Sequence, residues 1–96
     1  MSEMSSILHL EELRREISAI DTEILLLAGK RSALAAKIGE LKREIGLDVV
    51  DPKREGEVRV HYHDRALEAG VSEMCAERIA EVLMEEGRRV QKLSSQ

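Results

Sequence analysis

The first half of this 96-residue chain carries a long, regular row of aliphatic residues, which restricts its fold to helices packed on helices. Steps of alternately three and four residues from Leu10 to Ile45 fall on Leu or Ile at ten of eleven positions. The eleventh position is Arg31. This spacing places the aliphatic side chains along one face of an α-helix, as in a coiled-coil seam.

The predicted first helix covers about residues 7–46 and is too long for a compact domain of this size. Ser5 or Ser6 is expected to cap its start, and Gly46 to end it. The helix is roughly 60 Å long at 1.5 Å per residue, whereas a compact domain of this size has a radius of gyration of roughly 13 Å. The helix must therefore extend beyond its own subunit, and we expect another chain to cover its seam.

Two shorter helices are predicted after the first. Asp51 followed by Pro52 is typical of a helix start, and this second helix is expected over about 52–69, before Gly70. Ser72 is expected to cap a third helix over about 72–92, which has one apolar face.

The sequence thus predicts an all-α fold with three helices per chain: long, short and medium. Residues 8–93 are expected to form one helical domain, and residues 1–7 a disordered or frayed N-terminus. Strands are not expected, because no run of β-branched residues alternates with polar ones.

Composition excludes several classes of protein. The single cysteine, Cys75, rules out an internal disulfide and a cysteine-cluster metal site. No apolar stretch approaches the ~20 residues of a membrane span, and the N-terminus lacks the basic region of a signal peptide. The net charge of −4 argues against nucleic-acid binding. We expect a cytoplasmic protein with no membrane or nucleic-acid partner.

Arg31 is the anomaly of the seam, because a buried guanidinium without a partner is costly. It could set the register of the helix pairing, or its charged end could reach out to solvent. Alternatively, it marks an anion site inside the bundle. Lys42 lies almost three turns further along the same face, roughly 16 Å away, so the two side chains could hold a small dianion between them. Gly39, in the gap, either leaves space for a ligand or lets another helix approach closely.

Arg14 favours an antiparallel pairing of two long helices. It lies roughly 25 Å from Arg31 along its own helix, too far to share a ligand. If two copies overlap fully in antiparallel orientation, Arg14 of one copy lies beside residues 36–39 of the other, between Arg31 and Lys42. A parallel pairing would place Arg31 against its own copy. We therefore predict an intertwined antiparallel homodimer, a six-helix bundle with two equivalent cationic sites.

The order and spacing of these residues resemble the all-helical class of chorismate mutases over about residues 8–92. The motifs that carry the resemblance are Leu13-Arg14-x-x-Ile17-x-x-x-Asp21, Arg31, Gly39-x-x-Lys42, Asp51-x-x-Arg54-Glu55 and Gln91. Each motif alone is weak, but their joint order and spacing are specific.

The resemblance implies a role for each matching residue. Arg14, acting in trans, and Arg31 hold the two carboxylates of chorismate, and Arg54 supports this anion site. Lys42 and Gln91 are the catalytic residues and donate hydrogen bonds to the ether oxygen. Glu55, with backbone near Asp51, accepts the ring hydroxyl, and Asp51 also reads as a helix cap. Without the other motifs, Gln91 reads as a solvated residue of a frayed last turn.

The implied reaction converts chorismate to prephenate by rearrangement within one molecule, in phenylalanine and tyrosine biosynthesis. It needs no nucleophile, metal or cofactor. At the substrate-binding position where the family often carries a hydroxyl residue, this chain has Gly87, so one carboxylate contact is expected to be missing or replaced by water. Arg88 and Arg89 are expected to be favourable charges near a helix C-terminus rather than ligands.

Two other functions fit the same features. One is a related helical lyase that removes pyruvate from isochorismate in a similar cationic pocket. The other is a non-catalytic helical dimerisation or regulatory module, in which Arg31 has no ligand.

Overall fold

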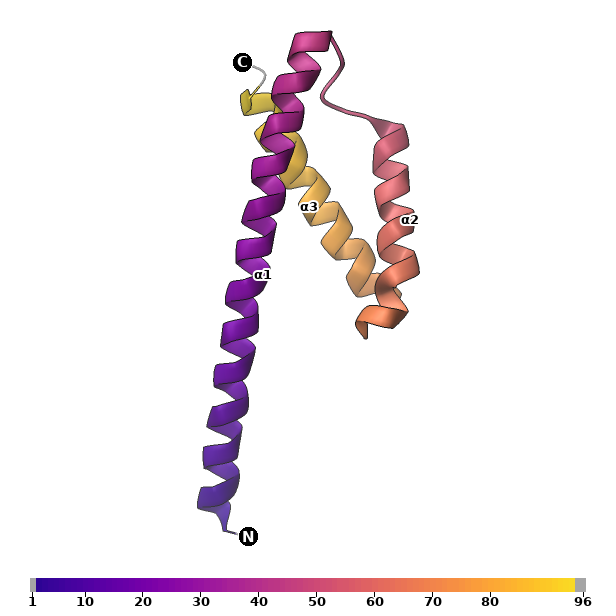
Figure 1. Ribbon diagram of the computed structural model, residues 1–96. Helices are drawn as coiled ribbons and strands as arrows, with labels where there is room; N and C mark the ends of the chain where they lie inside the picture. Colours follow the sequence, from indigo (N-terminus) through magenta and orange to yellow (C-terminus); the bar gives the residue numbers. More distant parts are fainter. Residues whose placement is uncertain (1, 95–96) are drawn as a thin grey trace. The chain divides into compact units, whose positions relative to one another are not determined.

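A computed structural model describes residues 2–94, and every regular element in that part of the chain is a helix (Figure 1). The helices are α1 (Glu3–Ile45), α2 (Pro52–Ala69) and α3 (Glu73–Ser94). The predicted all-α class with a long, a short and a medium helix is confirmed.

The N-terminus differs from the prediction, because α1 begins at Glu3 and residues 3–7 are helical rather than frayed. The hydroxyl of Ser2 accepts a hydrogen bond from the backbone N–H of Ser5 at 3.3 Å, which caps the helix before the predicted Ser5 or Ser6. Glu3 adds an acidic side chain to the first turn, where the helix dipole favours it. Met1 lies outside the described residues.

Glycine in the left-handed conformation ends both α1 and α2. Gly46 has a φ of 74° and Gly70 a φ of 76°, a region that side chains with a Cβ disfavour. After Gly46, the N–H of Leu47 donates to the carbonyl oxygen of Lys42 at 2.8 Å. This turn begins the short connection to α2.

Side-chain caps start α2 and α3. Asp51 accepts a hydrogen bond from the backbone N–H of Arg54 at 3.1 Å, and Pro52 occupies the first helical position. Ser72 accepts one from the N–H of Cys75, also at 3.1 Å.

The chain divides into two compact units, and the boundary lies within α1, between Lys30 and Arg31. The first unit is the amino-terminal part of α1, whose seam residues are all at least 43% exposed. They are Leu10, Leu13, Ile17, Ile20, Ile24 and Leu27. A row of this length and apolarity is typical of a surface that another helix covers.

The second unit contains the rest of α1 together with α2 and α3, and small residues fill its core. Figure 1 shows α3 beside the carboxyl-terminal part of α1 and, at its other end, next to α2. The buried residues are Ala35, Gly39, Ala66, Ala76, Ala80, Met84 and Gly87. Because most of these side chains are small or absent, the helix backbones approach closely.

We predict that the ion pair between Arg59 of α2 and Glu81 of α3 stabilises the fold at neutral pH but not in acid. Arg59 Nε donates to Glu81 Oε1 at 2.5 Å, and this hydrogen bond lowers the pKa of the Glu81 carboxyl and raises that of Arg59. A carboxyl whose pKa is lower in the folded chain stabilises above its unfolded pKa and ceases to as the pH falls through its folded pKa. Glu81→Gln should therefore lower the urea midpoint at neutral pH, and progressively less below about pH 4. Glu85→Gln, at an exposed position of the same helix, is the control, and a pH-independent effect of Glu81→Gln would contradict the prediction.

Candidate active site

A cavity of about 500 Å³ lies in the second unit, with all three helices and the α1–α2 connection contributing to its wall. It brings together seven of the eight site positions predicted from the sequence. These are Arg31, Lys42, Asp51, Arg54, Glu55, Gly87 and Gln91. Residues more than fifty positions apart in the sequence thus share one wall.

Lys42 and Gln91 are joined by a hydrogen bond across the α1–α3 interface. Lys42 Nζ donates to Gln91 Oε1 and to the carbonyl oxygen of Val49, each at 2.8 Å. An ammonium group has three N–H donors and no acceptor, so one donor remains for a ligand. Because the amide oxygen of Gln91 faces Lys42, its NH₂ group is the part left to donate into the cavity. Gln91 is therefore fixed by α1 rather than solvated in a frayed turn.

The position of Gln91 depends on Gly39. A Cβ atom on Gly39 would lie 2.8 Å from the Cα and 2.9 Å from the carbonyl oxygen of Gln91. No side chain fits there without moving the α3 backbone, so Gly39 serves the close approach of two helices.

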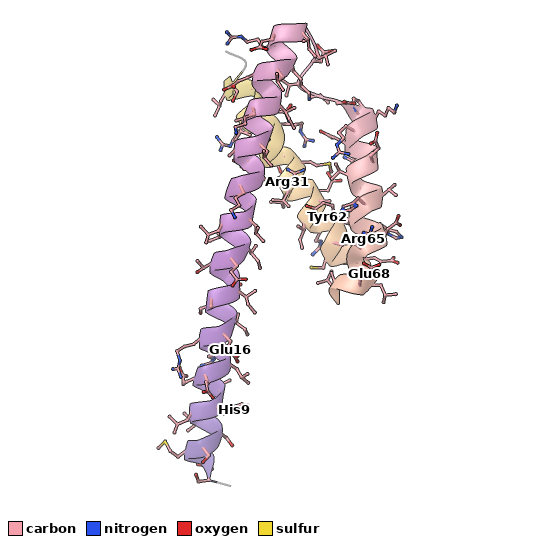
Figure 2. The ribbon with its side chains drawn as sticks, viewed as in Figure 1. His9, Glu16, Arg31, Tyr62, Arg65 and Glu68 are labelled. Atoms are coloured by element: carbon pink, nitrogen blue, oxygen red, sulfur yellow. The ribbon has the colours of Figure 1, made fainter. Side chains whose placement is uncertain are left out.

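Arg31 lies on α1 next to α3, as Figure 2 shows, and is part-buried. Its Nη1 donates to the carbonyl oxygen of Leu83 at 2.7 Å, which satisfies part of the guanidinium and fixes its direction. A guanidinium has five N–H donors, so others remain for an anion. A Cβ atom on Gly87 would meet Arg31 Nη1 at 3.5 Å, an ordinary contact, so glycine is not required at that position.

Asp51 and Arg54 lie at the start of α2. Asp51 is the N-cap described above, in agreement with its reading as a cap. The side chain of Arg54 is 68% exposed and its Nη1 lies 3.5 Å from Glu57 Oε2. Arg54 therefore contributes its charge from the exposed end of the cavity wall.

Glu55 is held by a residue that the sequence analysis assigned elsewhere. Arg88 Nη1 donates to Glu55 Oε2 at 2.7 Å, and Arg88 lines the cavity. The sequence analysis placed Arg88 near a helix C-terminus and not among the ligands, and it did not foresee this ion pair with Glu55. Its place three residues before Gln91, and so on the same helical face, was a signal for this role. Arg89 instead is 60% exposed and pairs with Glu86 on its own helix.

Arg14 is the one predicted site residue that does not line this cavity. It belongs to the first unit, its side chain is 64% exposed, and its Nη1 lies 3.3 Å from Glu11 Oε1.

Within residues 2–94, no three His, Cys, Asp or Glu side chains are grouped to hold a metal ion. No helix of this part of the chain is both long and apolar enough to cross a membrane.

The chain is similar in sequence to known proteins. The family described as chorismate mutase type II matches residues 13–92, a span that contains all eight predicted site positions. The chain belongs to the chorismate mutase type II family. No solved structure shows a significant match to it.

Three curated proteins are similar to this chain, and two of them are much longer than it. The chorismate mutase of Methanocaldococcus jannaschii is 32% identical over 86% of this chain and 84% of the relative. The bifunctional chorismate mutase/prephenate dehydratase of Aquifex aeolicus is 49% identical over 51% of this chain, and the T-protein of Haemophilus influenzae 35% identical over 83%. The matched parts cover only 14% and 20% of these two longer proteins.

For this type II chain we predict that Gly39→Ala destabilises the fold and displaces Gln91. Alanine favours a helix over glycine by about 1 kcal/mol, but the clash with the α3 backbone opposes it, with a typical overpacking cost of about 1–3 kcal/mol. The control is Gly56→Ala in α2, where an added Cβ has no atom within 4 Å. In urea denaturation at equal protein concentration, Gly39→Ala should be less stable than Gly56→Ala, and equal stability would contradict the geometry.

Proposed function

We propose that this chain is a chorismate mutase, which rearranges chorismate to prephenate for phenylalanine and tyrosine biosynthesis. The observation that carries the proposal is the cavity in which Arg31 and the Lys42–Gln91 pair face one space, in a chain of the type II family. The reaction breaks a carbon–oxygen bond and forms a carbon–carbon bond within one molecule, so the side chains have only to orient the substrate and stabilise charge.

We further propose that the active molecule is an antiparallel homodimer, to which each partner contributes Arg14. The exposed aliphatic seam of α1 supports a second copy as its cover, since seam residues such as Ile17 and Ile24 are more than half exposed. The exposed guanidinium of Arg14 is available for a site in the partner. Two identical sites follow from the twofold symmetry.

Orientation is the first source of rate enhancement. Arg31 and the partner's Arg14 bind the two carboxylates of the substrate by charge-assisted hydrogen bonds, with Arg54 adding positive charge. Chorismate is flexible, and holding both carboxylates selects the compact conformer in which the reacting carbon atoms meet.

Stabilisation of developing charge is the second source. As the carbon–oxygen bond breaks, negative charge grows on the ether oxygen, where the third N–H of Lys42 and the NH₂ of Gln91 donate. The bond between these two side chains places both donors before the substrate arrives. Glu55 and the backbone near Asp51 accept the ring hydroxyl, an interaction present before and during the reaction.

We predict that the purified protein consumes chorismate and forms prephenate without added metal or cofactor. Lys42→Ala should leave a folded dimer and lower kcat by about 10²–10³, the usual cost of losing one such donor. Chorismate loss is followed by ultraviolet absorbance and the product identified by chromatography. The matched control is Lys37→Ala, at an exposed lysine of the same helix.

Other outcomes of this assay assign other functions. Salicylate and pyruvate formed from isochorismate, with poor mutase turnover, would make the chain a lyase of the same fold. A folded dimer that turns over neither substrate would be a non-catalytic module. Near-normal turnover by Lys42→Ala would remove the assigned role of Lys42.

We also predict that mixing two inactive variants restores activity. In a hybrid of Arg14→Ala and Lys42→Ala chains, one site has both substitutions and the other has neither, provided that Arg14 acts in trans. Random reassortment should return about a quarter of wild-type activity, since half of the dimers are hybrids with one intact site. The variants are unfolded and refolded together, with separately refolded samples as the control. No recovery would show that Arg14 acts within its own chain.

A further inference from the structure

We propose that Arg88 is a positioning residue, which holds the Glu55 carboxylate toward the ring-hydroxyl side of the cavity and away from the substrate-binding cations. This inference rests on the proposed mutase function and deepens it. Arg88 acts through Glu55 rather than on the substrate.

The Glu55–Arg88 pair differs from the ion pairs on the surface of the same unit. Its side chains are only 18% and 28% exposed, whereas those of the Arg59–Glu81 pair, which also joins α2 to α3, are 47% and 52% exposed. The pairs Arg54–Glu57, Arg65–Glu68 and Arg89–Glu86 each lie within one helix, and all their side chains are at least 42% exposed. An exposed pair within one helix contributes little to stability, whereas a partly buried, charge-assisted hydrogen bond between two helices fixes the geometry of both side chains.

A second cation supports the same carboxylate. Arg59 lies one turn after Glu55 on α2, and its Nη2 is 3.6 Å from Glu55 Oε1. Arg59 is itself bound to Glu81 of α3. Alternating charges thus run from Arg88 through Glu55 and Arg59 to Glu81 and join α2 to α3, and the first two of these residues line the cavity.

The placement of Glu55 matters because of the charges around it. The cavity wall carries four cationic residues, Arg31, Lys42, Arg54 and Arg88, and two acidic ones, Asp51 and Glu55. Asp51 is occupied as a helix cap. A glutamate free to rotate could pair with Arg31 or Lys42 and neutralise the cations that a dianionic substrate requires.

The hydrogen bonds of Arg31 and Lys42 agree with the proposal that Glu55 is kept away from these two cations. Arg31 donates to the carbonyl oxygen of Leu83, and Lys42 donates to Val49 and Gln91, so these contacts leave both charges uncompensated by a carboxylate. Arg88 takes the Glu55 carboxylate instead. The acidic side chain can then accept a hydroxyl group without lowering the attraction for the two substrate carboxylates.

A double-mutant cycle in the full-length dimer tests this role. Arg88→Gln should raise KM about tenfold, the effect of losing one hydrogen bond to a charged group. It should change kcat much less, because Glu55 holds the hydroxyl equally in the ground state and the transition state. In a Glu55→Gln background, Arg88→Gln should add less than about twofold to KM, since two residues that act as a unit are not additive. Arg89→Gln, at the exposed neighbouring position, is the control and should leave KM unchanged.

Each other outcome has a definite meaning. Multiplicative effects of the two substitutions would show that Arg88 binds the substrate itself and overturn the proposal, as would an unchanged KM in folded Arg88→Gln. If Arg88→Gln does not fold, Arg88→Lys, which keeps the charge with a different geometry, should give an intermediate KM, and a wild-type KM would overturn the proposal. Absence of turnover by the wild type, measured first, would overturn the proposed function and this inference together. Wild-type turnover with an additive cycle would overturn this inference alone.

Discussion

The close contact between Gly39 and the backbone of Gln91 is the constraint on which the cavity depends. It sets how near α3 lies to α1, and so allows Lys42 to reach the Gln91 amide. A larger residue would push the Gln91 backbone away from α1 and strain the 2.8 Å hydrogen bond between Lys42 and Gln91. The absence of a side chain at Gly39 therefore determines both the contact between α1 and α3 and the arrangement of the Lys42 and Gln91 donors.

The charges of the lining residues make the cavity suited to an anionic ligand. Four cationic residues from three helices line the cavity, and partly buried charges are unfavourable without compensation. Backbone carbonyl oxygens of Val49 and Leu83 accept from Lys42 and Arg31, which partly satisfies these groups without neutralising them. The glutamate that lines the cavity, Glu55, is bound by Arg88. The remaining charge imbalance suits an anionic ligand.

Much of the fold followed from the sequence, because the signals were local. Asp51 and Pro52 start α2 as a cap and a first helical residue, and Gly70 ends it in the left-handed conformation that glycine favours. The start of α1 was missed because Ser2, Ser5 and Ser6 can each cap a helix, and the sequence alone did not decide among them.

The site was predicted best where its residues share one helix. Arg31 and Lys42 are related by helical spacing, so their common face could be calculated. Arg88 was missed because its partner is on another helix, and the rotation of α3 against α2 depends on packing that no local pattern encodes. The position of Arg14 relative to the cavity stays a prediction, because in the proposed dimer it depends on the contact between two chains.

Gly39 and Gly87 both lie where α1 and α3 pack against each other, but an added Cβ atom would meet different atoms at the two positions. Any substitution at Gly39 meets main-chain atoms of Gln91, which cannot rotate away, so the α3 backbone has to move. At Gly87 the nearest atom belongs to the movable end of Arg31, at an ordinary contact distance, so a small side chain is admissible. Adaptation of this cavity to a differently shaped anion is therefore open at Gly87 and closed at Gly39.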